Sequence, residues 1–183
     1  MEIVELTQET WPSLENLFAA NKTVGGCWCT WFMRPHADVE AGWGAGNKEF
    51  LRSHLGAPLG LVAIDDGEPC GWVAVAPRPT YPRLERSKIT ASGAGPDTWS
   101  VTCFFVHRRA RGRGLAAELL AAAVDHARRG GARAVEGHPV DTAGAHRSPG
   151  DIFHGTLAMF RAAGFELVDR RGARRALVRK ELR

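Results

Sequence analysis

The segment Trp99 to Arg129, WSVTCFFVHRRARGRGLAAELLAAAVDHARR, decides the fold of this 183-residue chain. Its first part, Trp99 to Val106, is rich in β-branched and aromatic residues, which predicts a buried strand. From Gly114 onward, alanine and leucine recur at steps of three and four residues, which predicts an amphipathic helix that ends at a pair of glycines, 130–131. The segment is therefore predicted to form a strand, a loop and a helix.

The loop between this strand and this helix, HRRARGRG at 107–114, combines four arginines with two glycines. Gly112 and Gly114 allow the backbone to turn tightly and to approach a ligand closely. The first N–H groups of the following helix have no partner within the helix, and they favour an anion together with the arginine charge. We therefore expect this loop to hold a phosphate group.

The order strand, Arg109-x-x-Gly112-x-Gly114, helix resembles the hallmark of the GCN5-related N-acetyltransferase (GNAT) family. Further along, FRAAGF at 160–165 resembles the late helix of that family, which ends in a Gly-Phe pair before a strand. The matching parts cover roughly the last half of the chain, and their order makes the combination specific. The resemblance implies that acetyl-coenzyme A binds with its pyrophosphate on the loop amides and its thioester against exposed backbone of the fourth strand.

The resemblance implies an acetyl-CoA site made by Phe104, Phe105, Val106, Arg109, Arg111, Gly112, Arg113 and Gly114. The three strand residues are also explained by core packing of their side chains. Any one of the arginines is also explained as a solvated surface side chain. Neither alternative affects the backbone amides of the loop, which are expected to bind the pyrophosphate in either case.

Acetyl transfer to an amine requires a base for the ammonium and a proton donor for the departing thiolate. GNAT enzymes commonly supply that proton from a tyrosine at a position that is Phe160 here, and phenylalanine cannot donate. Tyr81, the only tyrosine of the chain, is the candidate acid, with an exposed loop tyrosine as the alternative. Glu136, at the predicted end of the fifth strand, is the candidate base, with a carboxylate paired to an arginine as the alternative.

The least regular segment, residues 21–46, contains several tryptophans and the tripeptide Cys27-Trp28-Cys29. Irregular loops on a rigid scaffold often carry recognition, so Trp28 and Trp31 are predicted to line an acceptor pocket. Core packing is the alternative for each tryptophan. Two cysteines at this spacing, without a second pair, fall short of a zinc signature, and we expect no metal.

The other elements predict an antiparallel N-terminal half that leads into one βαβ unit. Helices are predicted to start near Trp11, to be capped by Asn47 and run to His54, and to be capped by Asp151 and run to Ala163. Further strands are predicted at 3–6, 59–64, 71–76, 132–136, 165–168 and 173–180. The fold class is α/β with a mixed, mostly antiparallel central sheet, one parallel βαβ unit and helices on both faces, which is the GNAT-like fold.

The composition, 44% hydrophobic and 24% charged, is that of an ordinary soluble globular protein, and the length predicts a single domain over residues 1–183. The N-terminus has acids where a signal peptide needs basic residues, and no segment is long and apolar enough for a membrane span. Four cysteines are few for a disulfide scaffold, so we expect reduced thiols in a cytoplasmic protein. A homodimer is compatible with these features.

The net charge of +4 raises the question of a nucleic-acid partner. The arginines concentrate at 108–113 and 170–183 without interleaved aromatic residues, and a phosphate-bearing cofactor explains the first cluster more simply. We therefore expect no nucleic-acid partner.

The predicted function is transfer of an acetyl group from acetyl-CoA to a primary amine of a small molecule or peptide, by direct attack in a ternary complex with Glu136 assisting deprotonation. One rival is an NAD(P)-binding oxidoreductase, because Gly112-x-Gly114-x-x-Ala117 also fits the dinucleotide pattern. Five residues separate Val106 from Gly112, however, and only one parallel unit is predicted. The other rival is a non-catalytic acyl-CoA sensor, which the missing family tyrosine leaves possible.

Overall fold

The computed structural model describes residues 1–19, 21–148 and 150–182. Its helices and strands are, in chain order, β1 (Glu2–Glu5), α1 (Trp11–Ala19), α2 (Val24–Cys27), α3 (His36–Ala41), α4 (Ala45–Ser53), β2 (Gly60–Asp65), β3 (Glu68–Pro77), β4 (Thr98–Val106), α5 (Leu115–Arg129), β5 (Ala134–Gly137), α6 (Leu157–Ala162), β6 (Glu166–Arg171) and β7 (Arg175–Glu181). Short 3-10 turns, η1 (Arg78–Thr80), η2 (Pro82–Arg86) and η3 (Arg108–Ala110), follow β3 and β4. None of the helices in these ranges is both long and apolar enough to cross a membrane.

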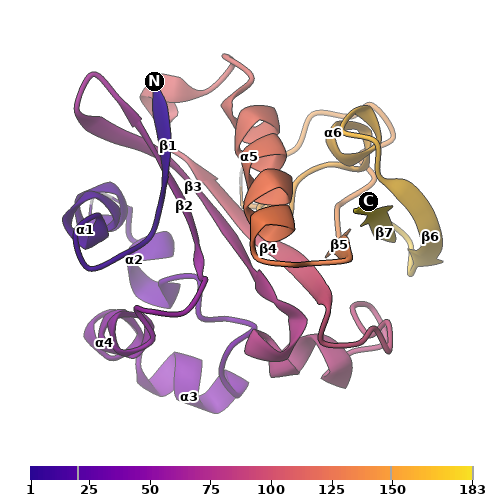
Figure 1. Cartoon of the computed structure of the whole chain (residues 1–183), viewed down its shortest axis with the longest axis horizontal. Helices are drawn as coiled ribbons and strands as arrows, with labels where there is room; N and C mark the ends of the chain where they lie inside the picture. Colours follow the sequence, from indigo (N-terminus) through magenta and orange to yellow (C-terminus); the bar gives the residue numbers. More distant parts are fainter. Residues whose placement is uncertain (20, 149, 183) are drawn as a thin grey trace.

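In the described part of the chain, seven strands form one sheet in the order β1-β2-β3-β4-β5-β7-β6 (Figure 1). Neighbouring strands are antiparallel except β4 and β5, which are parallel and are joined through α5. This confirms the predicted class, a mostly antiparallel mixed sheet with one βαβ unit.

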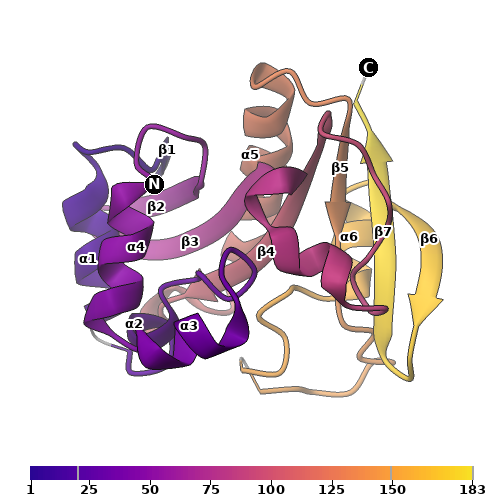
Figure 2. The same cartoon turned by 90° about the horizontal axis from the view of Figure 1, so that it is seen from below.

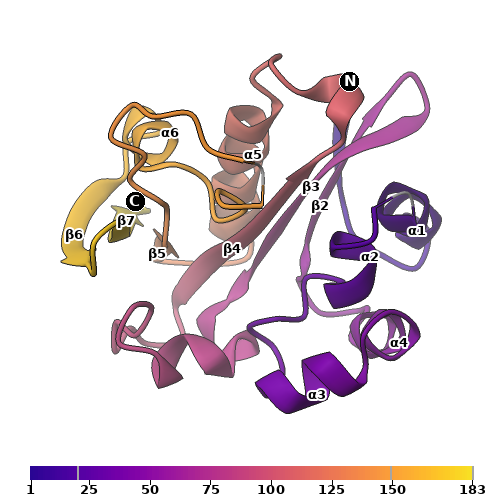
Figure 3. The same ribbon diagram turned by 180° about the vertical axis from the view of Figure 1, so that it is seen from behind.

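Helices cover both faces of the sheet (Figures 1 and 3). On one face α5 packs on β2, β3 and β4, and α6 lies beside α5. On the other face α1 packs on β2 and β3, and α2 and α4 complete that apolar cluster. The apolar stripe predicted for α5 is buried, since Leu115 and Leu119 pack over Gly71, where a Cβ would lie 3.0–3.1 Å from their side chains. Each such leucine contributes roughly 1.5–3 kcal/mol by leaving water.

The parallel pair β4–β5 ends halfway along β4. Only Thr98–Val101 are paired with β5, whereas Thr102–Val106 have no strand on that edge. The register of β4 against β3 also shifts at this point, because Ala74 pairs with Cys103 and Val75 with Val101. Figure 2 shows β5, β7 and β6 grouped on one side of β4 and helices α1–α4 on the other. We call Thr102–Val106, which no described strand covers on the β5 side, the open half of β4.

Two predicted helix starts are wrong. Helix α4 begins at Ala45, and Asn47 is buried inside its first turns, where Nδ2 donates to Gly26 O (3.0 Å) and Val39 O (2.8 Å). The Asn47 side chain therefore ties segments of the chain together instead of capping a helix.

The helix predicted to be capped by Asp151 has its N-cap five residues later. Thr156 is the N-cap of α6, and its Oγ1 accepts from Met159 N at 3.3 Å. The physical reason is that residues 151–155 are engaged by β4, because Phe104 N donates to Phe153 O at 2.7 Å. A helix from Asp151 would need that carbonyl for its own hydrogen bonds.

Candidate active site

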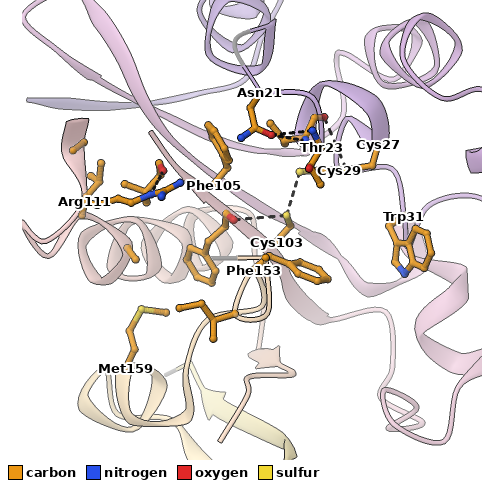
Figure 4. A pocket seen from close by; sticks show the side chains of 18 of the residues that line it. Asn21, Thr23, Cys27, Cys29, Trp31, Cys103, Phe105, Arg111, Phe153 and Met159 are labelled. Carbon is orange, nitrogen blue, oxygen red and sulfur yellow. Dashed lines mark hydrogen bonds between the residues drawn. The ribbon is translucent and has the colours of Figure 1, made fainter. Parts of the chain in front are cut away.

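A pocket of about 690 Å³ lies beside the open half of β4. Its walls come from β4, the start of α5, the segment between α1 and α4, and residues 150–159 (Figure 4). In the view of Figure 4, Arg111 lies at one end and Trp31 at the other, with Cys29 and Cys103 between them. The three parts of the pocket are therefore a basic end, a middle and an aromatic end.

The basic end is formed by the glycine loop and the N-terminus of α5. Gly112 and Gly114 line the pocket and have φ angles of +75° and +82°, a region that glycine adopts without strain. Gly114 is the N-cap residue of the 15-residue helix α5 and provides no side-chain cap. The first N–H groups of α5 are thus available to an anion, together with the positive end of the helix dipole.

The arginines of the loop are placed differently from one another. Arg111 lines the pocket, and its Nε donates to Val106 O at 3.0 Å. Arg109 instead donates to Pro69 O at 3.0 Å. Arg113 pairs with Asp65 at 3.1 Å. Of the three arginines expected at the pyrophosphate, only Arg111 lines the pocket, because the β2–β3 hairpin offers acceptors to the other two.

Backbone groups on the β5-side edge of the open half of β4 already have hydrogen-bond partners. Phe104, Phe105 and Val106 line the pocket, but Phe104 N already donates to Phe153 O. Two residues earlier, the carbonyl of Thr102 accepts from His154 Nδ1 at 2.9 Å. Burial lowers the pKa of His154 to about 3, so its ring is neutral at pH 7. The expected exposed backbone is therefore bound by residues 153–154, and a ligand that uses the Phe104 N–H must displace the Phe153 carbonyl.

The candidate base, Glu136, does not line this pocket. Its side chain is 2% exposed and accepts from Arg78 Nη1 (2.9 Å), Ser92 Oγ (2.8 Å) and Arg179 Nη1 (3.3 Å). The expectation that Glu136 faces the crevice is not met, because β5 directs it into a buried ion-pair cluster. The alternative of an arginine-paired carboxylate describes its environment.

The candidate acid, Tyr81, does not line the pocket. Its side chain is 2% exposed, and burial raises the pKa of its hydroxyl. Phe160, at the family's tyrosine position, is fully buried against Gly137, where a Cβ would lie 2.3 Å from its ring. The neighbouring Met159 lines the pocket instead. Neither ring therefore reaches the pocket in this structure.

Three thiols form the middle of the pocket, and sequence reasoning missed their convergence. Cys27, Cys29 and Cys103 all line it, and Cys29 Sγ donates to Cys103 Sγ at 3.2 Å (Figure 4). The signal was a Cys-x-Cys followed by a third cysteine 74 residues away in β4, which only the fold brings together. No group of three or more potential ligands in the described ranges is arranged to hold a metal ion.

The residues of the aromatic end lie in the loops that flank the short helices α2 and α3. Trp31, Phe32 and Trp43 line it, and Trp43 is 52% exposed. Trp28 does not line it, since its ring is buried and stacked on Trp11 at 5.6 Å. Of the two predicted acceptor residues, the structure therefore brings Trp31 into the pocket and places Trp28 in the core.

Residues 8–147, most of the chain, match the sequence profile of the family described as the Acetyltransferase (GNAT) family. No curated protein gives a significant sequence match.

Solved structures with a similar fold cover the whole chain at low identity. One is a ribosomal-protein-alanine N-acetyltransferase from Brucella melitensis (TM-score 0.57, 20% identity, 100% of both chains). Another is the PaiA N-acetyltransferase from Thermoplasma acidophilum in complex with coenzyme A (0.54, 16%, 99% of this chain and 98% of that one). A third is a GNAT family acetyltransferase from Brucella melitensis in complex with acetyl-CoA (0.54, 16%, 100% and 88%).

Proposed function

Because the chain belongs to the GNAT family of acetyltransferases, we propose that it transfers the acetyl group of acetyl-CoA to a primary amine by direct attack in a ternary complex. The observation that carries the proposal is the uncapped N-terminus of α5, which opens into a pocket that continues along β4 to an aromatic end. One end of this pocket suits a pyrophosphate, and the other has room for a second substrate.

For the acetyl donor, we propose that the amides of the Gly112–Gly114 turn and the Arg111 side chain bind the pyrophosphate. Acetyl-CoA supplies an activated thioester. Arg109 and Arg113 act indirectly, because their bonds to the β2–β3 hairpin fix the loop in place. The side chains of Phe105 and Val106 then line the path from the loop to the middle of the pocket.

For the acceptor, we propose a small molecule or peptide whose primary amine is attached to an apolar body. The acceptor end is walled by Trp31, Phe32 and Trp43, and among the described residues that line the pocket none is a carboxylate. A polyamine with several charges lacks a counter-ion there, whereas an aromatic ring finds apolar surface and offset stacking partners. We also propose a cytoplasmic location. The chain has only four cysteines and all are free thiols, which is typical of proteins in a reducing compartment.

The first experiment is calorimetric titration of the purified protein with acetyl-CoA and, separately, with NAD and NADP. We expect micromolar affinity for acetyl-CoA only. In Gly112→Val, a β-branched residue must adopt φ near +75°, so the turn reorients and the affinity falls at least 100-fold, roughly 2.7 kcal/mol. Gly131→Val, at φ +82° just after the C-terminal end of α5, carries the same backbone strain away from the pocket and is the matched control.

The second experiment follows thiol release from acetyl-CoA with 2-phenylethylamine, putrescine and an alanine-initiated peptide as acceptors. We expect 2-phenylethylamine to give a higher kcat/KM than putrescine. Binding of NAD instead of acetyl-CoA would overturn the proposal, as would acetyl-CoA binding without turnover of any amine.

A further inference from the structure

The pocket contains an unusual set of titratable side chains. Among the described residues that line it, the only ones with a titratable group are Arg111 and the three thiols of Cys27, Cys29 and Cys103. An arginine stays charged, so only the thiols can exchange a proton near neutral pH. Acetyl transfer must remove a proton from the ammonium and deliver one to the leaving thiolate.

A strained turn places two of these thiols in the pocket. Trp28 and Cys29, directly after α2, both adopt left-handed φ angles, +50° and +54°, which is rare for residues other than glycine. Thr30 stabilises the turn, with its Oγ1 donating to Cys27 O at 2.8 Å. The turn directs the Trp28 ring into the core while Cys27 and Cys29 line the pocket. Such strain persists where the surroundings impose it and is often found at functional sites.

The third thiol comes from the strand that leads to the phosphate loop. Cys103 lies on β4 next to Phe104, and Cys29 Sγ donates to its Sγ at 3.2 Å. In the view of Figure 4, Cys27 lies on the Trp31 side of the Cys29–Cys103 pair, and Arg111 lies on the opposite side. The thiols therefore connect the end proposed for the acceptor with the strand proposed for the donor.

We propose that Cys27, Cys29 and Cys103 form a proton relay for acetyl transfer, in which Cys27 accepts a proton from the acceptor amine and Cys103 donates one to the leaving thiolate. The proposal rests on the proposed function and goes beyond it by naming the groups that move protons. Glu136 and Tyr81 have no part in it, because neither lines the pocket.

The proposed steps balance as follows. The Cys27 thiolate takes a proton from the ammonium, and the neutral amine forms a C–N bond to the acetyl carbon while the C–S bond to coenzyme A breaks. The coenzyme A thiolate takes the proton of the Cys103 thiol, and the second amine proton leaves to solvent. The proton on Cys27 then passes through Cys29 to Cys103, which restores the starting state. The sum is one amide, one free coenzyme A thiol and one released proton for each ammonium and thioester.

The surroundings of each thiol fit its step. In the structure, Cys27 Sγ donates to Val24 O at 3.9 Å, and the single S–H of Cys29 is bonded to Cys103. When the Cys29 S–H turns to Cys27 instead, this hydrogen bond and those from backbone N–H groups lower the pKa of Cys27 to about 7, despite the opposing effect of burial. The hydrogen bond with Cys103, together with burial, raises the pKa of Cys29, which therefore keeps its proton and can share it with either neighbour. Tyr81 lies close to Cys29 and Cys103, and burial raises its pKa so that it stays neutral, whereas Arg111 lines the opposite end of the pocket. Cys103 lines the pocket from β4, the strand proposed for the donor, so its thiol is on the side where the thiolate departs.

The first test is the pH profile of kcat/KM with acetyl-CoA and 2-phenylethylamine under reducing conditions. We expect activity to rise with pH through about 7 in the wild type, because the Cys27 thiolate is the active form. Cys27→Ala should lose this limb and at least tenfold of the rate at pH 7. Cys29→Ala should shift the limb to higher pH, because the hydrogen bond that favours the Cys27 thiolate is gone. A structural role would not move the limb.

The second test is crossed rescue. Phenylhydrazine resembles 2-phenylethylamine in size but is largely neutral at pH 7, so Cys27→Ala should approach wild-type rate with it, whereas Cys103→Ala should not. Aryl thioacetates have a leaving thiolate that needs no proton, so they should restore Cys103→Ala and not Cys27→Ala. Equal behaviour of the two variants toward both substrates would overturn the relay.

Cys70→Ala is the matched control, because Cys70 lies on β3 outside the pocket, and its profile should equal that of the wild type. Calorimetry with acetyl-CoA verifies that each variant is folded and separates loss of binding from loss of proton transfer. An acetyl group found on Cys27 by mass spectrometry without an amine would make Cys27 a nucleophile and overturn the relay. Wild-type turnover with unchanged pH profiles in all variants would overturn the relay and leave the acetyltransferase proposal intact.

Discussion

The two halves of β4 differ in what they do with reactive groups. Beside the half paired with β5, Thr98–Val101, lies the buried cluster of Glu136 with its two arginines. Beside the open half, Thr102–Val106, lie the thiols and the pocket. The closed half has the stronger acids and bases, but each is neutralised by a partner. Apart from Arg111, the titratable groups beside the open half are the weakly acidic thiols, yet they face space that a substrate can fill. Whether a cluster of reactive side chains is structural or catalytic therefore depends more on its access to substrate and on its charged partners than on the residue types in it.

The largest effect expected from this contrast is on stability. Glu136→Ala leaves the buried Arg78 with only Glu85 as a counter-charge, and we expect a loss of about 3 kcal/mol in the free energy of unfolding, measured with urea. Acetyl-CoA affinity of the folded protein should not change. Glu181→Ala removes another partner of Arg179, 67% exposed, and should cost less than about 1 kcal/mol. Similar losses in the two variants would contradict the contrast.

Phe160→Tyr tests whether the position used by the family for a proton donor can serve here. The new hydroxyl would be buried against Gly137, so we expect a loss of roughly 1–3 kcal/mol in unfolding free energy and no gain in kcat. Phe32→Tyr adds the same hydroxyl at the pocket wall, where water can reach it, and should leave stability nearly unchanged. A higher kcat in Phe160→Tyr would show that the ring reaches the substrates after all.

Each half of β4 also has a buried neutral histidine beside it, His138 bonded to Thr90 O and His154 bonded to Thr102 O. Burial lowers both pKa values to about 3, below the value near 6.5 of an unfolded chain. The unfolded state therefore binds more protons below pH 6.5, and stability is lost as pH falls from about 6 to 4, by up to roughly 1.4 kcal/mol per pH unit for each histidine.

His154→Gln keeps a donor for Thr102 O and removes the titration. We expect its unfolding free energy to depend on pH less steeply than that of the wild type, by up to about 1.4 kcal/mol per pH unit between pH 6 and 4. His138→Gln should give a similar reduction, and the double variant the sum of the two. Urea titrations at several pH values measure this directly, and slopes equal to the wild type would show that these histidines are protonated in the folded protein.

The smallest effect concerns the acceptor end. Trp31→Ala removes an aromatic wall, and we expect the KM for 2-phenylethylamine to rise about tenfold, which corresponds to about 1.4 kcal/mol. The affinity for acetyl-CoA should stay the same, because Trp31 and Arg111 lie at opposite ends of the pocket. A change confined to acetyl-CoA binding would assign this end to the donor instead.

Sequence patterns within one segment predict the elements whose structure depends on that segment alone. The strand from Trp99, the glycine loop and the stripe of α5 follow from residue period and turn chemistry within the segment 99–129. Asn47 was predicted as a cap because asparagine favours caps, but two carbonyls from other segments bind its side chain. Tertiary partners overrode a correct local preference.

The candidate site was predicted unevenly for the same reason. Gly112, Gly114 and Arg111 line the pocket, since a loop that opens a helix points its amides in a known direction. The burial of Glu136 and Tyr81 could not be predicted from the neighbouring sequence. A strand end or a loop is buried or exposed according to which distant segments pack on it. The thiol cluster joins two segments 74 residues apart, and the sequence contains no periodic signal for such a contact.

The segment that binds the open half of β4 has a consequence for solubility. A strand with unpaired N–H and C=O groups is a template for pairing with another chain. The carbonyl of Phe153 and the ring of His154 occupy two of these groups, so the sheet does not present a bare strand inside the pocket. A ligand that displaces this segment covers the same N–H and C=O groups of β4 in its place. A deletion of residues 153–154 without a bound ligand would leave these groups free and favour strand-to-strand aggregation.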